Sequence, residues 1–175
     1  MINNRNNILK NKNILALDPS LSSTGWAVFD DKNTCPEVNR IQTKISDGNT
    51  DERITMIVNK IQTLAFSYKI RHVIFEDGYI GKSAKTGLQL AELRGAIIYI
   101  LRAQGYDVYH MMPSQIRKAF GLKGNAKKEE VANAVLEKYP ELENKIGPYS
   151  DKQNKKKTSD MYDAISIGEA FKHTR

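Results

Sequence analysis

Two short apolar runs in this chain each end in a carboxylate, and no other feature restricts its fold as strongly. The first run covers residues 14–18 and ends in Asp18, and the second covers residues 72–76 and ends in Glu76. Apolar runs of this length are typical of strands buried in a sheet. Binding sites in open α/β sheets form at the carboxyl ends of the strands. Either acid alone is more simply a turn residue, but both stand where a site would form.

The segment after the first run sets the direction of the second strand. Residues 24–29 form another strand candidate, and the break at residues 19–23 is too short to cross over to a parallel partner. The first two strands are therefore predicted to be antiparallel. A weaker third strand is predicted near residues 38–45.

Helical periodicity separates the remaining strands. An apolar face recurs through residues 51–65, for which Thr50 is the predicted N-cap. Residues 84–103 predict a long helix that is apolar around much of its circumference. One sheet face cannot cover so much apolar surface, so we expect this helix also to contact a second subunit. The helix at residues 84–103 also supplies a right-handed crossover between the strand at residues 72–76 and a parallel strand at residues 106–111.

The C-terminal part of the chain is predicted to be helical. Helices are expected at residues 113–120 and 127–139. An exposed lysine-rich loop is expected at residues 150–157, and Thr158 or Ser159 is expected to cap a final helix.

The order of these elements predicts an α/β fold. Its five-stranded mixed sheet would have three antiparallel strands first, then two strands parallel to the first, with helices on both sides. Residues 14–175 are expected to form one domain after a polar arm at residues 1–13.

Composition narrows the class of protein. The single cysteine, Cys35, excludes an internal disulfide and a cysteine-based zinc site, and it fits the reducing cytoplasm of a bacterial or phage-infected cell. No apolar run is long enough for a membrane span, and the polar N-terminus lacks the pattern of a secretory signal. The net charge of +7 and the pI near 9.4 favour a polyanionic partner such as nucleic acid.

A second pair of acids lies near the C-terminus. Asp160 and Asp163 are three residues apart, so their side chains share one face of a helix. Acids in a first helical turn can simply complement the macrodipole. If this pair meets Asp18 and Glu76, however, four carboxylates would repel one another unless a cation neutralised them. Oxygen ligands without cysteine indicate Mg²⁺, with Mn²⁺ as a substitute, and two such ions can clamp a phosphodiester.

Several short motifs follow one another in a characteristic order. They are residues 14–19 with Thr24-Gly25, residues 73–76 with Tyr79, Leu93-Arg94-Gly95, Gln115-Ile116-Arg117 with residues 124–128, and Asp160-Met161-Tyr162-Asp163-Ala164. Together they resemble the RuvC family of Holliday-junction resolvases, which belongs to the RNase H-like superfamily. The chain departs from that family at Ser20, where glycine is usual, and in a longer lysine-rich segment before Thr158. Its short, lysine-rich form is similar to phage-encoded members.

The resemblance implies roles for particular residues. It places the family's metal-binding acids at Asp18, Glu76, Asp160 and Asp163, and Lys128 completes the predicted catalytic set. Tyr79 falls where the family uses an aromatic ring against unstacked bases. The predicted DNA-binding residues are Tyr79, Lys82, Lys85, Arg117, Lys118, Lys127, Lys128, Lys155, Lys156 and Lys157.

The expected function is a metal-dependent endonuclease that resolves four-way DNA junctions by paired nicks. The resemblance implies a homodimer packed through the helix at residues 84–103. Two alternatives remain: a broader nuclease for branched DNA or structured RNA, and a DNA-binding module without catalysis. Asp18 with Thr24-Gly25 also resembles the phosphate motif of actin-like ATPases, but those proteins need two lobes and this chain has length for one. No nucleotide cofactor is therefore expected.

Overall fold

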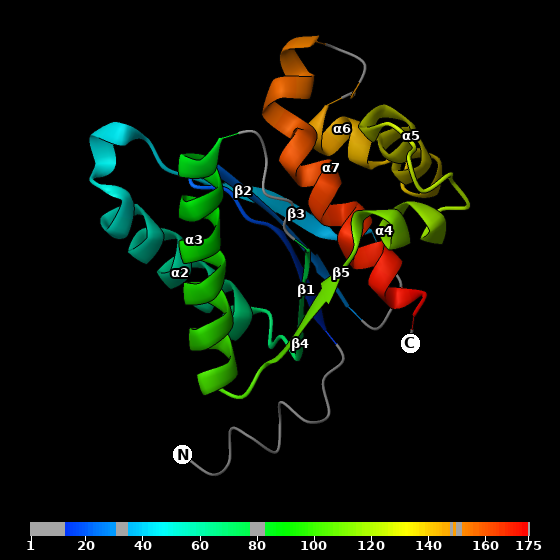
Figure 1. Cartoon of the computed structure of the whole chain (residues 1–175). Helices are drawn as coiled ribbons and strands as arrows, with labels where there is room; N and C mark the ends of the chain where they lie inside the picture. The colour runs from blue at the N-terminus through cyan, green and yellow to red at the C-terminus, as the bar shows by residue number, and fades with distance from the viewer. Residues whose placement is uncertain (1–12, 31–34, 78–82, 148, 150–151, 175) are drawn as a thin grey trace.

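A five-stranded mixed sheet forms the centre of the molecule (Figure 1). The computed structural model describes residues 13–30, 35–77, 83–147, 149 and 152–174, with the backbone alone for residues 152–157. The strands are β1 (Ile14–Asp18), β2 (Ser23–Phe29), β3 (Glu37–Gln42), β4 (His72–Glu76) and β5 (Asp107–Met111), in the order β3-β2-β1-β4-β5. β1, β2 and β3 pair antiparallel, and β4 and β5 run parallel to β1. The predicted strand directions are confirmed.

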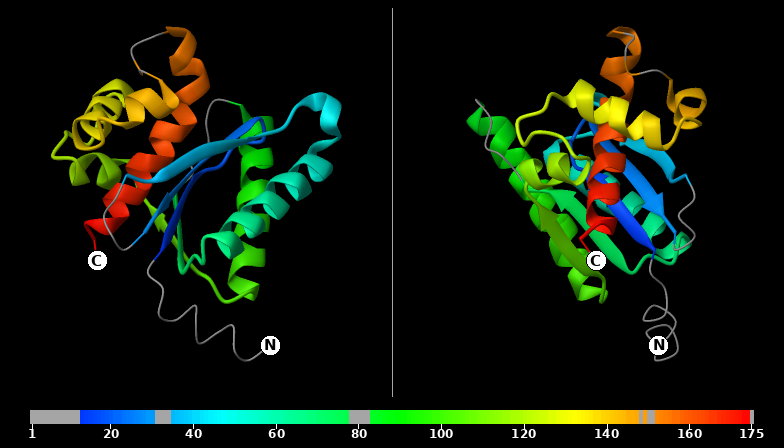
Figure 2. Two further views of the ribbon diagram at one scale, coloured as in Figure 1. Left: turned by 180° about the vertical axis from the view of Figure 1, so that it is seen from behind. Right: turned by 90° about the vertical axis from the view of Figure 1, so that its right-hand side faces the viewer.

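Helices cover both faces of this sheet (Figures 1 and 2). α2 (Thr50–Ser67) and α3 (Ala84–Ala103) lie on one face, and α7 (Lys152–Lys172) crosses the other. The shorter elements are α4 (Pro113–Ala119), α5 (Lys128–Lys138) and α6 (Leu142–Ile146) on the α7 side, and a 3-10 turn, η1 (Ile45–Asp47), before α2. None of the helices in the described part of the chain has the length and apolar character of a membrane span.

Side-chain alternation along the strands divides the core into two layers. On β1, Leu15 and Leu17 are buried in the layer that contains α2 and α3, whereas Ile14 and Ala16 are buried on the α7 side. Successive side chains in a strand point to opposite faces of the sheet. Asp18 therefore falls on the α7 face, as the next residue in the series after Ile14 and Ala16.

α7 packs closely on the sheet at two glycines. A Cβ atom at Gly25 of β2 would lie 1.9 Å from the carbonyl oxygen of Asp160, and one at Gly168 of α7 would lie 2.1 Å from the ring of Phe29. Both distances are well inside van der Waals contact, so neither position can hold a larger residue without moving the helix. Gly25 and Phe29 belong to the same strand, so these two contacts fix how α7 lies along β2.

Two predicted boundaries near α2 were wrong by a few residues. The N-cap of α2 is Asn49, whose side chain accepts a hydrogen bond from the backbone of Glu52 at 3.0 Å, and Thr50 is the first helical residue. Asn is among the strongest N-cap residues, ahead of Thr. The third strand ends at Gln42 because the chain then turns into η1.

The start of α7 is the largest correction. Residues 152–157 are helical, so the predicted loop was wrong over these residues, and the predicted cap at Thr158 or Ser159 was wrong as well. Lysine is a good helix former, and no Pro or Gly interrupts the chain from Lys152 to Ile167. A run of charged residues indicates exposure to solvent, which a helix surface provides as well as a loop does.

Candidate active site

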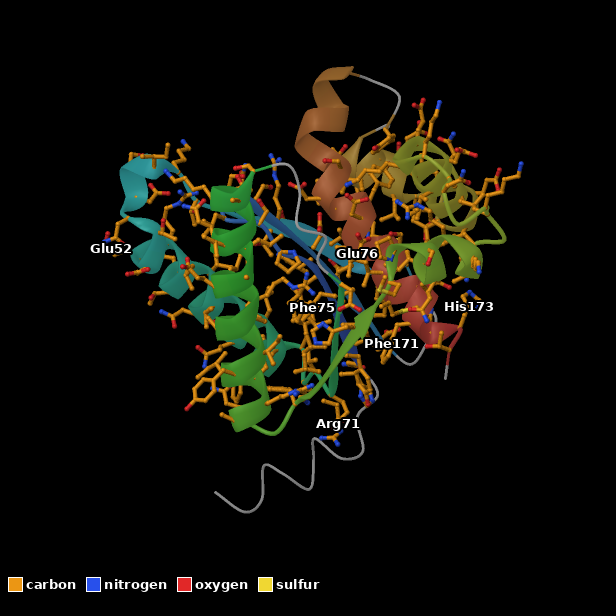
Figure 3. The ribbon with its side chains drawn as sticks, in the orientation of Figure 1. Glu52, Arg71, Phe75, Glu76, Phe171 and His173 are labelled. Carbon is orange, nitrogen blue, oxygen red and sulfur yellow. The ribbon has the colours of Figure 1, made fainter. Side chains whose placement is uncertain are left out.

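The two acids at the strand ends lie side by side on the α7 face. β1 and β4 are adjacent and parallel, and Leu17 pairs with Phe75, so Asp18 and Glu76 follow at the same level. In Figure 3, Glu76 lies at the end of β4 that α7 crosses, and Arg71 lies at the opposite end. The predicted meeting of these two carboxyl groups follows directly from the strand directions.

Asp160 and Asp163 approach the same place from α7. Asp18 pairs across the strands with Gly25, and Gly25 is the residue that the backbone of Asp160 approaches. Because α7 begins at Lys152, both acids lie inside the helix rather than in its first turn. The macrodipole acts mainly within the first turn. It therefore does not account for two acids at these positions.

The pKa of Asp18 shows that the acids interact with one another. Burial raises this pKa well above its ordinary value, and repulsion from Asp163 raises it further, with smaller contributions from Asp160 and Glu76. The positive charge of Lys128 opposes this rise. A buried carboxylate with like charges around it is costly to keep ionised.

Glu76 and Asp163 have raised pKa values for the same reasons. Burial is the largest cause for Glu76, followed by repulsion from Asp163. Burial is also the largest cause for Asp163, and the neighbouring Lys128 opposes it. Asp18, Glu76, Asp160 and Asp163 thus form one electrostatic cluster, which we call the acid cluster. Carboxyl groups with raised pKa values that gather in this way, here Asp18, Glu76 and Asp163, are typical of functional sites.

Lys128 is the cation that faces the acid cluster. It is the first residue of α5, and its Nζ forms an ion pair and hydrogen bond with Oδ2 of Asp163. Burial lowers the pKa of Lys128, but attraction to Asp163, Asp18 and Glu76 outweighs burial and raises it. Lys128 therefore keeps its positive charge beside these acids at neutral pH.

Arg117 lies next to the same cluster but is held by the backbone. Its Nε donates to the carbonyl oxygen of Ala126 at 2.9 Å, and one terminal nitrogen donates to that of Gly124 at 3.5 Å. Its charge partly opposes the rise in the pKa of Glu76 that burial causes. Arg117 therefore braces the loop that carries Lys128 and also adds positive charge near the acids.

The donor chemistry of the acid cluster suits a hard divalent cation, since Mg²⁺ and Mn²⁺ prefer carboxylate oxygens. Within the described residues, no three His, Cys, Asp or Glu side chains are grouped closely enough to hold a metal ion as they stand. Asp163 instead contacts the ammonium group of Lys128. The location and the chemistry of the acids fit a divalent ion.

The structure describes only some of the other predicted DNA-binding residues. Lys118 on α4, Lys127 before α5 and Lys85 at the start of α3 are exposed to solvent. Tyr79 and Lys82 lie outside the described residues. Lys155, Lys156 and Lys157 belong to the first turns of α7, and their side chains also lie outside the description.

Sequence reasoning did not assign a role to two residues that hold the site together. Thr24 is fully buried, and its hydroxyl donates to the carbonyl oxygen of Ser20 at 2.7 Å and accepts from the backbone nitrogen of Ser20 at 3.1 Å. Arg94 of α3 lies 5.2 Å from the centre of the Phe75 ring and 3.6 Å from the Asp77 carboxylate. Both residues occur in the motifs quoted above, and their contacts secure the segments that follow Asp18 and Glu76.

Comparison with known proteins decides the family. The family model for the crossover junction endodeoxyribonuclease RuvC matches residues 14–167. The chain belongs to the RuvC family. RuvC of Ehrlichia canis is 26% identical over 156 residues, which are 89% of this chain and 92% of the relative. RuvC of Ehrlichia ruminantium (strain Gardel) is 30% identical over 124 residues, 68% of this chain and 78% of the relative.

Solved structures give the same fold. T. thermophilus RuvC in complex with a Holliday junction substrate has a TM-score of 0.71 at 19% identity, covering 91% of each chain. The yeast mitochondrial Holliday junction resolvase has a TM-score of 0.65 at 12% identity, covering 96% of this chain and 82% of that one. The predicted RNase H-like fold is confirmed. As a RuvC-family member, the chain is a crossover junction endodeoxyribonuclease, a structure-specific junction endonuclease, and metal dependence is consistent with this family.

Proposed function

We propose that Asp18, Glu76, Asp160 and Asp163 hold two Mg²⁺ ions, for which Mn²⁺ can substitute, and that this centre cuts four-way DNA junctions. The observation that carries the proposal is that two strand ends and α7 bring these four acids together, where burial and the other three acids raise the pKa of Asp18. Cations among these oxygens would remove that repulsion. Bound metal would therefore offset much of the energetic cost of crowding the acids.

Each part of the site has a distinct task in the proposed reaction. Two bound ions would supply an activated water and would stabilise the leaving oxygen of the phosphodiester. Asp18 and Glu76 would bind these ions from the strand ends, and Asp160 and Asp163 would bind them from α7. Lys128 keeps its proton on Nζ and offers a fixed positive charge to a phosphate oxygen. The family resemblance implies a 5′-phosphate and a 3′-hydroxyl as products.

The DNA surface that we propose surrounds these acids on two sides. Arg117 and Lys118 belong to α4, Lys127 and Lys128 stand at the start of α5, and Lys85 belongs to α3. Tyr79, Lys82, Lys155, Lys156 and Lys157 are assigned to this surface from the sequence alone. The net charge of +7 supports binding to a polyanion. T. thermophilus RuvC, which shares this fold, was solved with a Holliday junction.

We also propose that the enzyme is a homodimer packed through α3. Leu88 and Tyr99 are 66% and 74% exposed, and their spacing places them on one face of this helix. Gly95 lies between them on that face, and a Cβ there would meet no atom of the described residues within 4 Å. A two-fold dimer would present two acid clusters to a junction with near two-fold symmetry. Paired nicks follow from that arrangement.

The decisive experiment is cleavage of a labelled synthetic four-way junction by purified protein, with Mg²⁺ or with EDTA. Asp18→Asn keeps the shape of the side chain and removes its charge, so we expect cleavage to fall by roughly a hundredfold or more while junction binding remains. Asp51→Asn, at an exposed position in the first turn of α2, is the matched control and should cut like the wild type.

Wild-type rates of cutting by Asp18→Asn would show that the assignment of the metal site is wrong. The same assay on three-way junctions, flaps and RNA–DNA hybrids separates a resolvase from a broader branched-DNA or RNA nuclease. Metal-independent binding of every substrate without strand scission would instead indicate a DNA-binding module.

A further inference from the structure

A hollow of about 400 Å³ lies at the turn that follows Asp18, on the side of α2 and α3. It is lined by residues 19–22 of the turn after β1, residues 43–45 between β3 and η1, Arg53 of α2 and the first turns of α3. Pro19 and Ser20 line it and directly follow Asp18 in the chain. The hollow therefore begins at the same end of the sheet as the proposed cutting site.

The walls of this hollow are held in place by hydrogen bonds. Arg53 donates from Nε to the hydroxyl of Thr43 at 2.9 Å and from a terminal nitrogen to the carbonyl oxygen of Leu21 at 2.9 Å. The backbone nitrogen of Thr43 donates to the carbonyl oxygen of Ser22 at 3.3 Å. These contacts join the turn after β1, the end of β3 and α2. A site with walls fixed in this way loses little conformational freedom when a ligand enters.

The α3 wall is joined to α2 in the same way. The side-chain amide of Gln89 donates from Nε2 to the hydroxyl of Thr50 at 3.1 Å. Its carbonyl oxygen can accept a further hydrogen bond. Ser20 and Ser22, whose hydroxyls lie 3.3 Å apart, add polar groups on the opposite wall. The hollow therefore offers hydrogen-bonding groups from two sides.

Two exposed side chains of opposite character line the same hollow. Ile45 is 88% exposed, the largest exposure among the big apolar side chains of the described residues. Its neighbour Lys44 is also exposed and carries a positive charge. An apolar surface beside a cation, with polar groups on the other walls, matches the flat face, the phosphate and the polar edge of a nucleotide.

We propose that this hollow binds one unpaired nucleotide of the branched DNA. The base contacts Ile45 and Leu21, its polar edge faces the serines and Gln89, and Lys44 contacts the adjoining phosphate. Bases at a branch point can leave the stack at a lower cost than bases within a duplex. This inference rests on the proposed function, since it takes branched DNA as the substrate. It adds a second binding site that would hold the branch at a set place relative to the acids.

The first test measures binding to a four-way junction and to a linear duplex of the same sequence, both in EDTA so that nothing is cut. Ile45→Ser and Lys44→Gln should each weaken junction binding roughly five- to tenfold and leave duplex binding nearly unchanged. Phe66→Ser and Lys60→Gln change exposed residues of the same types on α2 outside the hollow, and they should bind both DNAs like the wild type.

A second test asks whether the hollow holds a base. Abasic nucleotides are placed one at a time at the positions flanking the branch, and each junction is tested with the wild type and with Ile45→Ser. At one position the abasic change should weaken binding by the wild type but not by Ile45→Ser, because both changes remove the same contact. Additive losses at every position would overturn the proposal.

The two proposals can fail separately. If the wild type cuts junctions with Mg²⁺ while Ile45→Ser and Lys44→Gln bind them like the controls, the hollow has no role in binding and the cutting site stands. If the two variants lose junction affinity as expected while the wild type never cuts, the hollow is a DNA site and the proposed catalytic centre is wrong.

Discussion

Gly25 is the residue through which β2 and α7 come closest at the acid cluster. Gly25→Ala would place a methyl group against the backbone of Asp160, which cannot move without shifting α7. We expect a loss of roughly 1–3 kcal/mol in the free energy of unfolding. We also expect weaker binding of Mn²⁺ and slower cleavage at temperatures where the variant is folded. Thermal unfolding, calorimetric titration with Mn²⁺ and the junction assay measure these three effects.

Gly168→Ala is the matched control for this change. Gly168 lies on α7 away from the acids, and its added methyl group would meet the Phe29 ring of β2. A similar loss of stability with normal Mn²⁺ affinity is expected. Equal losses of metal affinity in both variants would mean that Gly25 supports the helix in general and has no particular role at the site.

Asp18 should limit stability when no metal is bound. Its pKa is raised by burial and by neighbouring acids, so ionised Asp18 is unfavourable in the folded state at neutral pH. In EDTA we expect Asp18→Asn to be more stable than the wild type by roughly 0.5–2 kcal/mol. Added Mg²⁺ should stabilise the wild type more than the variant, since ligands stabilise the state that binds them. Denaturant unfolding with and without Mg²⁺ measures both effects, and a less stable variant in EDTA would contradict the argument.

At the scale of elements, a second buried carboxylate joins α7 to α5. Glu169 is 1% exposed, and the hydroxyl of Tyr139 donates to it at 2.7 Å. Lys138, Lys172 and His173 lie around the same carboxylate. Burial raises the pKa of Glu169, but the hydrogen bonds and positive charges around it lower the pKa further, to below its ordinary value. This cluster therefore stabilises the fold in its ionised form, unlike the acid cluster.

Glu169→Gln should lower the free energy of unfolding at neutral pH by about 1.5–3 kcal/mol, because hydrogen bonds to a charged acceptor are lost. A carboxyl group whose pKa is lowered on folding stabilises the protein above its unfolded pKa. That stabilisation disappears as the pH falls through the lowered value. The difference in the free energy of unfolding between the wild type and Glu169→Gln should therefore be largest at pH 7 and should shrink below about pH 4.5.

Urea unfolding across this pH range provides the measurement. Glu137→Gln changes an exposed acid on α5 and should alter stability by no more than about 0.5 kcal/mol at any pH. A difference between wild type and Glu169→Gln that does not depend on pH would show that packing, and not charge, accounts for the effect.

At the scale of the whole molecule, the face of α3 that carries Leu88 and Tyr99 decides whether two sites act together. Leu88→Glu combined with Tyr99→Glu places charges on the proposed interface, and we expect the dimer to weaken at least tenfold. Light scattering during gel filtration reports the oligomeric state. On a cruciform plasmid, paired nicks give linear DNA and single nicks give open circles, so the variant should shift products toward open circles.

Met56→Glu with Phe66→Glu is the control for this experiment. Both residues are exposed and apolar but lie on α2, outside the proposed interface. This control should remain a dimer and give linear product. If the α3 variant remains a dimer, the subunits associate mainly through another surface and α3 contributes little to the dimer interface.

Much of this fold could be predicted from the sequence because it depends on local patterns. Apolar runs, the short break before Thr24 and the helical period of residues 84–103 determine the strands, their directions and the crossover. The strand directions then place Asp18 and Glu76 together, since parallel strands end at one edge of the sheet. The motif order added Asp160 and Asp163 through the family resemblance.

Contacts between distant segments were decided only by the tertiary structure. The ion pair of Lys128 with Asp163, the packing of Asp160 on Gly25 and the brace from Arg117 to Ala126 depend on how helices dock, which periodicity does not encode. The start of α7 was missed because lysines indicate exposure in a helix and in a loop alike. The hollow is lined by four segments that meet only in the folded chain, so no local pattern marks it. Residue types determine what a side chain can do, and packing determines which side chains do it together.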